Sequence, residues 1–550
     1  MRTRMRPVET LCAVAALGVC TAVPLACRQS VSPGVQVLVA VGDPAGSAAA
    51  ATPDPARLGV DFVWNCGSAD LRAVYNVIYV SPRGTDSDAC GASIATACKT
   101  VQRGLDRCAP APAAPPCSVL VEYGEYTESV ALRDGINLYG GCLPASESSP
   151  DDFSVFTAPP GGRPVMTAAN IGTGAHPWRV EVWGLRLVGS AAIESSAPST
   201  AVVVDNSRLL LAHTSIYAGA GAPGAHGVDA SPGNPGDAAI YPYSGANKSC
   251  ASTEGGVGGV ENTPQRVVDP NDLSRWRCTP QPALPTDGKP GAAGTTGVHA
   301  RRGGVGSPLS IDCTYEDAGE GRGGVGGTNG ACGAGGLKSG DPTGSIADLQ
   351  WRAAKGGDGG HGGDGGGGGG GGAGGWKCGY CLRRLQGFYW QPGDPGGGGG
   401  AGGCGAGPGG GGQQGGASIG LIGRDSELHF FHARFIGGVG GVGGAGGNGG
   451  NGGDGGNGSI GIDSGTDGGR GGNGGNGGNG GGSGGGAGGN GGPSILLAAV
   501  GRKNKWTENF DDYFPGRAGA GGKGGLRGGE SCDNRGDDGV PGTVVSNAQF

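Results

Sequence analysis

Residues 448–457 read Asn448-Gly-Gly-Asn451-Gly-Gly-Asp454-Gly-Gly-Asn457, and a second run follows as Arg470-Gly-Gly-Asn473-Gly-Gly-Asn476-Gly-Gly-Asn479. Glycine fills two of every three positions, so these runs have no apolar face to bury in an ordinary core. A left-handed helix of the polyproline II type has three residues per turn, which would place every Asn on one edge and bare backbone on the others. Such a helix has no internal hydrogen bonds, so bare edges let neighbouring helices bond one another. The phasing predicts a packed bundle of glycine helices, with a flexible linker as the alternative.

Composition limits the remaining possibilities. The chain has 550 residues, of which 132 are glycine and 5% are aromatic, so we expect one modest core. Collagen is a poor fit, because the long runs lack proline; glycine at every third position appears only briefly, as in Gly221-Ala-Pro-Gly224 and Gly288-Lys-Pro-Gly291. The net charge is −7 and no long basic run exists, which makes nucleic acid an unsuitable partner.

The N-terminus carries an export signal. Arg2, Arg4 and Arg6 precede an apolar stretch, residues 11–26, so residues 1–27 are predicted to be a signal peptide and the mature protein to be exported, to the cell surface, outer membrane or extracellular space. The sequence Val23-Pro-Leu-Ala-Cys27 resembles the lipobox of bacterial lipoproteins, which implies lipid attachment at Cys27. Proline departs from that pattern, so lipidation and ordinary cleavage both stay open. No second apolar run reaches the ~20 residues that a membrane span requires, so any membrane attachment is through lipid.

The cysteines beyond the signal are even in number, as expected of disulfides in an oxidising compartment. The close pairs predicted from spacing are Cys90 with Cys98, Cys108 with Cys117, Cys313 with Cys332, and Cys378 with Cys381. Cys378-x-x-Cys381 also permits redox chemistry, or zinc binding with Cys332 and Cys404, but it sits between glycine tracts and lacks a second close pair.

Order is expected to begin near residue 74, after a tether rich in Ala, Pro, Gly and Ser. Residues 99–108 have one apolar stripe and predict a short helix, and brief alternating strands follow at Val119/Val121, Val130/Leu132 and Ile136/Leu138.

This stretch resembles the N-terminal part of bacterial extracellular right-handed parallel β-helix domains, whose opening Y-V-S-x-x-G-x-D, K-T-hydrophobic helix and G-x-Y-x-E rung are matched over roughly 65 residues. The matching residues are Tyr79, Val80, Ser81, Gly84, Asp86, Lys99, Thr100, Gly124, Tyr126, Glu128, Gly140 and Gly141. The resemblance implies an all-β, right-handed parallel β-helix, or pectate-lyase-like solenoid, with a helix capping its first coil and with Tyr126 and Leu138 inside the stack. It says nothing about activity.

An internal repeat links the two halves of the chain. Residues 207–221 align with residues 426–440 at a constant offset of 219, and each copy is followed directly by a glycine-rich segment. We therefore expect the glycine regions to be long polyglycine-II-like insertions that leave one solenoid and return to it; the alternative is a solenoid ending near Gly219 and a separate, largely disordered half. The expected divisions are a signal (1–27), a tether (28–70), a capped β-helix (71–220), a glycine-rich, Cys-containing excursion (221–417), a coil (418–440), a Gly-Gly-X arm (441–493) and a terminal coil with tail (494–550).

The glycine tracts also resemble the repeat regions of PE-PGRS-type mycobacterial surface proteins. The helical N-terminal domain of that family is missing, so the likeness concerns repeat physics and surface exposure, and it transfers no functional residue.

The sequence contains no recognisable catalytic, cofactor-binding or metal-binding motif. Glu122, Glu125 and Glu128 are expected to be solvated or structural carboxylates, and His213 and His432 occupy equivalent repeat positions that suit a role in the coil. A calcium-binding β-roll motif fails at Gly456, where a large apolar residue is required. Tyr389, Trp390 and Trp506 are candidates for stacking on sugar rings, although packing against a coil or arm is the simpler interpretation.

These patterns predict a non-catalytic, exported surface protein with a structural, adhesive or glycan-binding role and an extracellular polysaccharide or cell-surface matrix as partner. A polysaccharide lyase or hydrolase on the same scaffold is the alternative, and a spacer without a partner is the third possibility.

Overall fold

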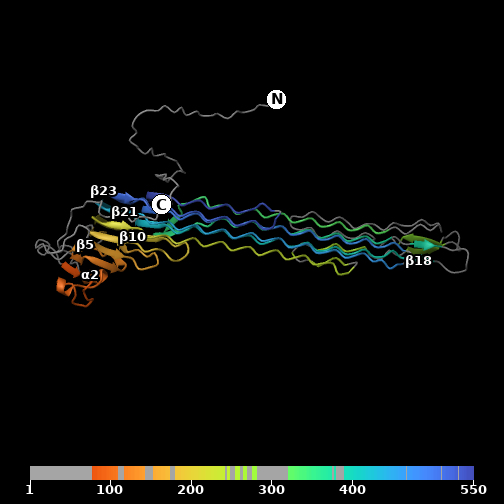
Figure 1. Ribbon diagram of the computed structural model, residues 1–550, viewed down its shortest axis with the longest axis horizontal. Coiled ribbons are helices and arrows are strands. Elements are labelled where there is room, and N and C mark those ends of the chain that lie inside the picture. The colour runs from red at the N-terminus through yellow and green to blue at the C-terminus, as the bar shows by residue number, and fades with distance from the viewer. Residues whose placement is uncertain are drawn as a thin grey trace, which may run out of the picture.

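The computed structural model describes residues 77–108, 117–142, 153–173, 180–241, 244–247, 250, 254–259, 264–268, 276–280, 320–374, 377–379, 389–465, 468–509, 511–530 and 532–550. Strands gather at one end of the molecule, and long, nearly straight glycine-rich segments extend from them towards β18 (Figure 1). The expectation of an all-β chain is confirmed for these residues, which form several parallel sheets.

Three stacked sheets, parallel throughout, make up the strand-rich end. Sheet 1 contains β1 (Val77–Val80), β2 (Cys117–Glu122), β5 (Ile136–Cys142), β8 (Val180–Trp183), β11 (Arg208–Ala212), β20 (Glu427–Phe431) and β23 (Lys505–Asn509). Sheet 2 contains β3 (Gly124–Thr127), β6 (Ser154–Thr157), β9 (Leu185–Val188), β12 (Ser215–Tyr217), β21 (Arg434–Ile436) and β24 (Asp512–Phe514). Sheet 3 contains β4 (Val130–Ala131), β7 (Met166–Ala169), β10 (Ser199–Asp205), β19 (Ser418–Arg424), β22 (Ser494–Val500) and β25 (Val544–Gln549).

The chain passes through sheets 1, 2 and 3 in turn and then returns to sheet 1 beside its previous strand. β11 pairs with β20, and β12 with β21, in the register of the 219-residue repeat, as Arg208 opposite Glu427 and Ser215 opposite Arg434 show. Strands on both sides of the glycine regions therefore belong to the same sheets, and the alternative of a separate second half is wrong.

The core lies between the three sheets. Alternate side chains of each strand point inward, and in sheet 2 the inward positions include Phe156, Leu187, Ile216 and Phe435, all fully buried. Tyr126 and Leu138 belong to the same cluster, as the β-helix resemblance implied.

The helix α2 (Val101–Arg107) packs against β1 and β2, with Val101 and Leu105 in the core. Two carboxylates hold its N-terminus. Asp86 accepts hydrogen bonds from the backbone N–H groups of Lys99 and Thr100, and Glu128 accepts from those of Val101 (2.8 Å) and Gln102 (3.0 Å). Burial raises the pKa of Glu128, against the lowering effect of these hydrogen bonds. The Asp and Glu of the resemblance pattern are thus helix caps, which satisfy N–H groups that the helix itself cannot.

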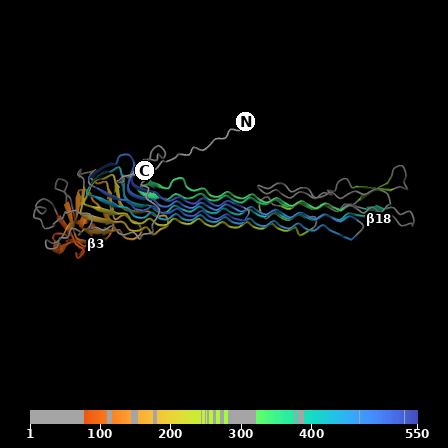
Figure 2. The same ribbon diagram turned by 45° about the horizontal axis from the view of Figure 1, so that its top comes forward.

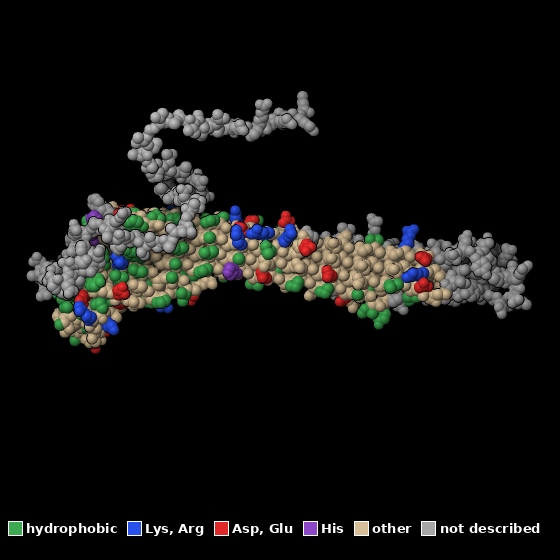
Figure 3. Space-filling view, viewed as in Figure 1, with side chains coloured by type: hydrophobic (Ala, Val, Ile, Leu, Met, Phe, Trp, Pro, Cys, Tyr) green, Lys and Arg blue, Asp and Glu red, His purple; other side chains and the backbone are tan. Residues whose placement is uncertain are grey.

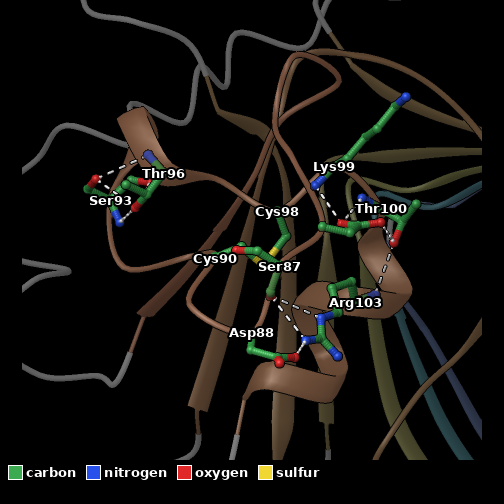
Figure 4. Close-up of a disulfide and its surroundings, with 10 residues drawn as sticks. Ser87, Asp88, Cys90, Ser93, Thr96, Cys98, Lys99, Thr100 and Arg103 are labelled. Atoms are coloured by element: carbon green, nitrogen blue, oxygen red, sulfur yellow. Dashed lines mark hydrogen bonds and ion pairs between the residues drawn. A yellow bond between two sulfur atoms is a disulfide. The ribbon is translucent and has the colours of Figure 1, made fainter.

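A disulfide between Cys90 and Cys98 closes the loop before α2 (Figure 4). The same loop contains the short 3₁₀ helix η2 (Ile94–Thr96), which begins at a capping box formed by Ser93 and Thr96. Arg103 of α2 reaches back to the carbonyl of Ser87, so the loop is held to the helix by a side chain as well.

The extended glycine-rich part is called the shaft below. Its segments comprise the described residues within 218–241, 244–259, 320–340, 354–374, 392–416, 437–462, 468–492, 515–529 and 532–543. A view turned by 45° shows the same long parallel segments (Figure 2). Antiparallel hairpins interrupt the shaft at β13 (Pro264–Val268) with β14 (Trp276–Pro280), β15 (Ser345–Ala347) with β16 (Gln350–Arg352), and β17 (Lys377–Gly379) with β18 (Tyr389–Gln391).

The β15–β16 hairpin folds back onto sheet 3. Its Trp351 is 4% exposed and packs against an apolar cluster that includes Ile419, Ile422 and Ile495. The amide of Gln414, which is fully buried, donates to the carbonyl of Pro342 and accepts from the N–H of Ala354. The junction between sheets and shaft is therefore fixed by packing and by a hydrogen-bonded amide.

An ion pair on sheet 3 joins two residues that lie 219 positions apart, just before the two repeat copies. Arg424 binds Asp205 through two hydrogen bonds of 2.8 and 2.7 Å, and the two residues are in register on β19 and β10. These bonds hold the pKa of Asp205 below its ordinary value, against the opposing effect of burial.

This pair predicts a dependence of stability on pH. A carboxylate with a lowered pKa stabilises the fold above its unfolded pKa, here near 3.8, and the contribution is lost as pH falls through the folded value. We expect Asp205→Asn to lower the Tm relative to wild type at pH 7, and the difference to vanish towards pH 2. Thermal unfolding across this range tests it, with Asp454→Asn on the shaft surface as the charge-matched control; a difference that persists at low pH would contradict the assignment.

Candidate functional site: the shaft and the outer face of sheet 2

Backbone hydrogen bonds join the shaft segments at intervals of three residues. The N–H groups of Gly221, Gly224 and Gly227 donate to the carbonyls of Val439, Val442 and Ala445 in a parallel neighbour. The N–H groups of residues 354–374 donate to two antiparallel neighbours, for example from Gly365 to Gly403 and from Gly366 to Thr328. Their carbonyls accept from a third, as in the bond from the N–H of Gly478 to Gly366. The triplet spacing of the sequence is thus the spacing of the hydrogen bonds.

The frequency of glycine follows the number of neighbours. Residues 218–241 lie at the rim of the shaft and place a glycine inward at 221, 224, 227, 233 and 236, while the intervening side chains are largely exposed. Residues 365–372, which are all glycine, are buried. A Cβ at Gly367 or Gly370 would overlap the backbone of the segment that contains residues 254–257, and one at Gly368 would overlap that of Gly475 in another segment. The shaft surface consists mostly of backbone and uncharged polar side chains, with scattered charged and apolar side chains (Figure 3).

The Asn residues at every third position serve the shaft itself. Nearer the sheets, the N–H groups of Gly446 and Gly449 donate to carbonyls of residues 515–529. Farther along the same segment, Gly455, Gly458 and Gly461 donate instead to the side-chain oxygens of Asn479, Asn476 and Asn473, at 2.9, 3.0 and 3.1 Å. Asparagine therefore replaces a neighbouring backbone where that neighbour has ended.

Residues 515–529 and 532–543 belong to the shaft, although the sequence predicted a terminal coil with tail for residues 494–550. Their signal was present, because glycine recurs at 516, 519, 522, 525 and 528. Gly519, Gly522 and Gly525 donate to Gly492, Gly489 and Gly486, so the tail is part of the bundle.

Disulfides pin the shaft across long sequence distances. The structure contains two of the pairs expected from spacing, Cys90–Cys98 and Cys108–Cys117. The predicted pair of Cys313 with Cys332 is wrong, because Cys332 is bonded to Cys532, 200 residues away. Cys404 is bonded to Cys250, so the zinc alternative loses both Cys332 and Cys404 as free thiolates. Cys313 and the side chains of Cys378 and Cys381 lie outside the described residues.

The aromatic candidates for glycan contact are not brought together. Trp506 lies in β23 opposite Leu428, and its ring packs edge-on against Phe430 with centroids 6.4 Å apart. Trp506 is thus partly buried and packs against the core, which agrees with the simpler interpretation of its role. The side chains of Tyr389 and Trp390, and the lipid-attachment candidate Cys27, lie outside the described residues.

The titratable candidates have structural roles. His213 and His432 stack with centroids 5.1 Å apart, both with positive φ, at the turns between sheets 1 and 2. Burial, with a smaller effect of His432, lowers the pKa of His213. Glu128 caps α2, and Glu122 pairs with Arg83.

One sheet face combines cationic and aromatic side chains. The outer positions of sheet 2 form a column of residues in register, Val155, Arg186, Ser215, Arg434 and Asp512. The guanidinium carbon of Arg186 lies 5.4 Å from the ring centroid of Phe153 and 5.6 Å from that of Tyr217. Sequence periodicity could place these residues outward but could not show that they adjoin.

Within the described ranges, no three His, Cys, Asp or Glu side chains gather as a metal-binding group. In the same ranges, none of the helices has the length and apolar character needed to cross a bilayer. A comparison with models of protein families, with curated proteins and with solved structures finds no match to this chain. The structure alone therefore defines the class of protein, which is nearly all-β with several parallel sheets.

Proposed function

We propose that the strand-rich end is a right-handed parallel β-helix and that the shaft is a bundle of polyglycine-II-like helices inserted into it. The recurrent order of sheets 1, 2 and 3 supports the coil, and the right-handed sense follows the general rule for parallel crossover connections. Hydrogen bonds at every third residue, each between different segments, support the polyglycine assignment.

On this fold, the protein acts as an exported, non-catalytic surface protein with a structural or adhesive role. The observation that carries the proposal is the continuous hydrogen bonding of the shaft. At ~3.1 Å per residue, the segment 437–462 spans about 80 Å, so the shaft would hold its far end well away from the sheets. Disulfides between remote segments suit an oxidising compartment outside the cytoplasm.

The proposed partner is an extracellular polysaccharide or cell-surface matrix, bound by many weak contacts along an extended surface. The alternative, a lyase or hydrolase, requires clustered carboxylates with a base on one exposed strand face. The outer face of sheet 1 carries Glu427 between Arg208, at 3.6 Å, and His429, at 3.2 Å. Both neighbours bond the carboxylate, which suits an ion-pair network better than a free nucleophile.

One experiment distinguishes a glycan-binding protein, an enzyme and a spacer. Purified protein is incubated with a panel of insoluble and soluble polysaccharides, and both sedimentation with the glycan and release of new reducing or unsaturated ends are measured. Binding without product is the expected result. Product release would establish the enzyme alternative, and the absence of both binding and product would leave a spacer as the remaining function.

A further inference from the structure

The outer face of sheet 2 presents two neighbouring columns of side chains. Leu187, Ile216 and Phe435 point into the core, so the residues beside them point outward. One outward column contains Arg186, Ser215 and Arg434. The other contains Val188, Tyr217, Ile436 and Phe514, and these four residues are all partly exposed. The strands of this sheet lead directly into the shaft at residues 218, 437 and 515, which places the face at the foot of the shaft.

Among the described residues, Arg186 contacts two aromatic rings and no carboxylate. Its guanidinium lies close to the rings of both Phe153 and Tyr217, an arrangement that orients the group through cation–π attraction. Its Nε atom is buried and donates to no acceptor among the described residues. Arginine presents five N–H donors in a planar fork that matches a carboxylate, and a buried donor without an acceptor is unfavourable.

The other charges of the face do not neutralise Arg186. Arg434 binds Asp512, with Nε 3.3 Å from Oδ2. Glu125, on the same column, lies two strands from Arg186, with Val155 between them, so their backbones are about 10 Å apart. Among the residues that the structure describes, Arg186 takes part in no ion pair.

We propose that this face binds a carboxylate-bearing polysaccharide, with a sugar carboxylate on Arg186 and sugar rings against Tyr217 and Phe514. An anion can bind the terminal Nη groups of the oriented guanidinium, which are not buried as Nε is, and flat aromatic side chains offer apolar surface to pyranose rings. Strands stacked at ~4.8 Å repeat these features along one axis, which suits a linear polymer. The inference rests on the proposed function, because it names the glycan class that the surface protein takes.

Binding to polygalacturonate and alginate tests the proposal, with neutral dextran as the uncharged comparator. We expect wild type to bind the two acidic polymers, to bind dextran weakly, and to lose affinity as salt is raised. Arg186→Gln is expected to lower affinity about tenfold or more, because a charge-assisted bidentate contact is lost. Arg186→Lys keeps the charge but not the fork and should fall between them. Arg208→Gln, on the outer face of sheet 1, is the matched control and should bind like wild type.

Thermal unfolding of each variant establishes that the sheets remain folded. If wild type binds acidic polymers and Arg186→Gln binds them equally well, this face is not the site, while the proposed function stands. Equal binding of dextran would overturn the carboxylate specificity. If wild type binds no polysaccharide of the panel, both the face and the glycan-binding function are wrong.

Discussion

Alanine at Gly327 is expected to destabilise the shaft strongly, whereas alanine at the adjacent Gly326 is expected to have almost no effect. A Cβ at Gly327 would overlap the carbonyl of Gly366 in the antiparallel neighbour, and backbone cannot move aside as a side chain can. At Gly326 the nearest atom to a Cβ is the carbonyl oxygen of Asn476, 3.6 Å away, which is an ordinary contact. Overpacking of this kind costs about 1–3 kcal/mol or more, whereas a tolerated Gly→Ala change stays within about 1 kcal/mol of wild type and can stabilise.

Thermal unfolding and amide hydrogen exchange measure the two effects. Gly327→Ala should accelerate exchange at Gly366 and Gly478, whose backbone lies against the new methyl group, and Gly326→Ala should leave these amides protected. Equal effects of the two substitutions would mean that the segments do not pack as described. Rapid exchange throughout the wild-type shaft would contradict the hydrogen-bonded bundle altogether.

The second large effect is expected at Gln414. Its Nε2 donates to the carbonyls of Pro342, at 2.6 Å, and Gly491, at 3.2 Å, and its Oε1 accepts from the N–H of Ala354. Gln414→Ala would leave three backbone groups without this partner, the buried one at Gly491 and the partly buried ones at Pro342 and Ala354, at a cost of ~1–3 kcal/mol for each group that water does not reach. We expect the β15–β16 hairpin to detach from sheet 3, with a loss of stability of about 3 kcal/mol.

Gln413 provides the matched control. Its side chain is exposed and accepts one hydrogen bond from Ser196, so Gln413→Ala should cost no more than about 1 kcal/mol. Tryptophan fluorescence and exchange at residues 345–352 report on the hairpin, since Trp351 is buried against sheet 3. An unchanged hairpin in Gln414→Ala would show that apolar packing alone holds it.

Much of the fold could be predicted from local periodicity in the sequence. The apolar alternation of residues 119–138 predicted buried strands, and the stripe of Val101 and Leu105 predicted the helix α2, because both patterns reflect contacts within one short element. The 219-residue repeat predicted the register of β11 with β20, since equivalent residues stack in neighbouring coils.

Contacts between remote residues could not be predicted in this way. The bond between Cys332 and Cys532 depends on which segments become neighbours in the shaft, and spacing along the chain does not encode that choice. The same holds for the candidate site, because Phe153, Arg186 and Tyr217 adjoin through three successive coils. The sequence left two roles open for Trp506, because an aromatic residue in the last strand can pack against a core or face a ligand, and the structure packs it against the core.

The connectivity of the shaft has a consequence for how the protein must fold. The strands from 77 to 217 stack on one another through contacts made within that stretch, so they can form before the rest of the chain has folded. The shaft joins residues 224 and 442, and residues 491 and 540, across its width. Closing such long loops is slow, and the final partners emerge only at the end of the chain. The shaft is therefore expected to assemble late, once residues up to 540 are available, on strands that have already folded.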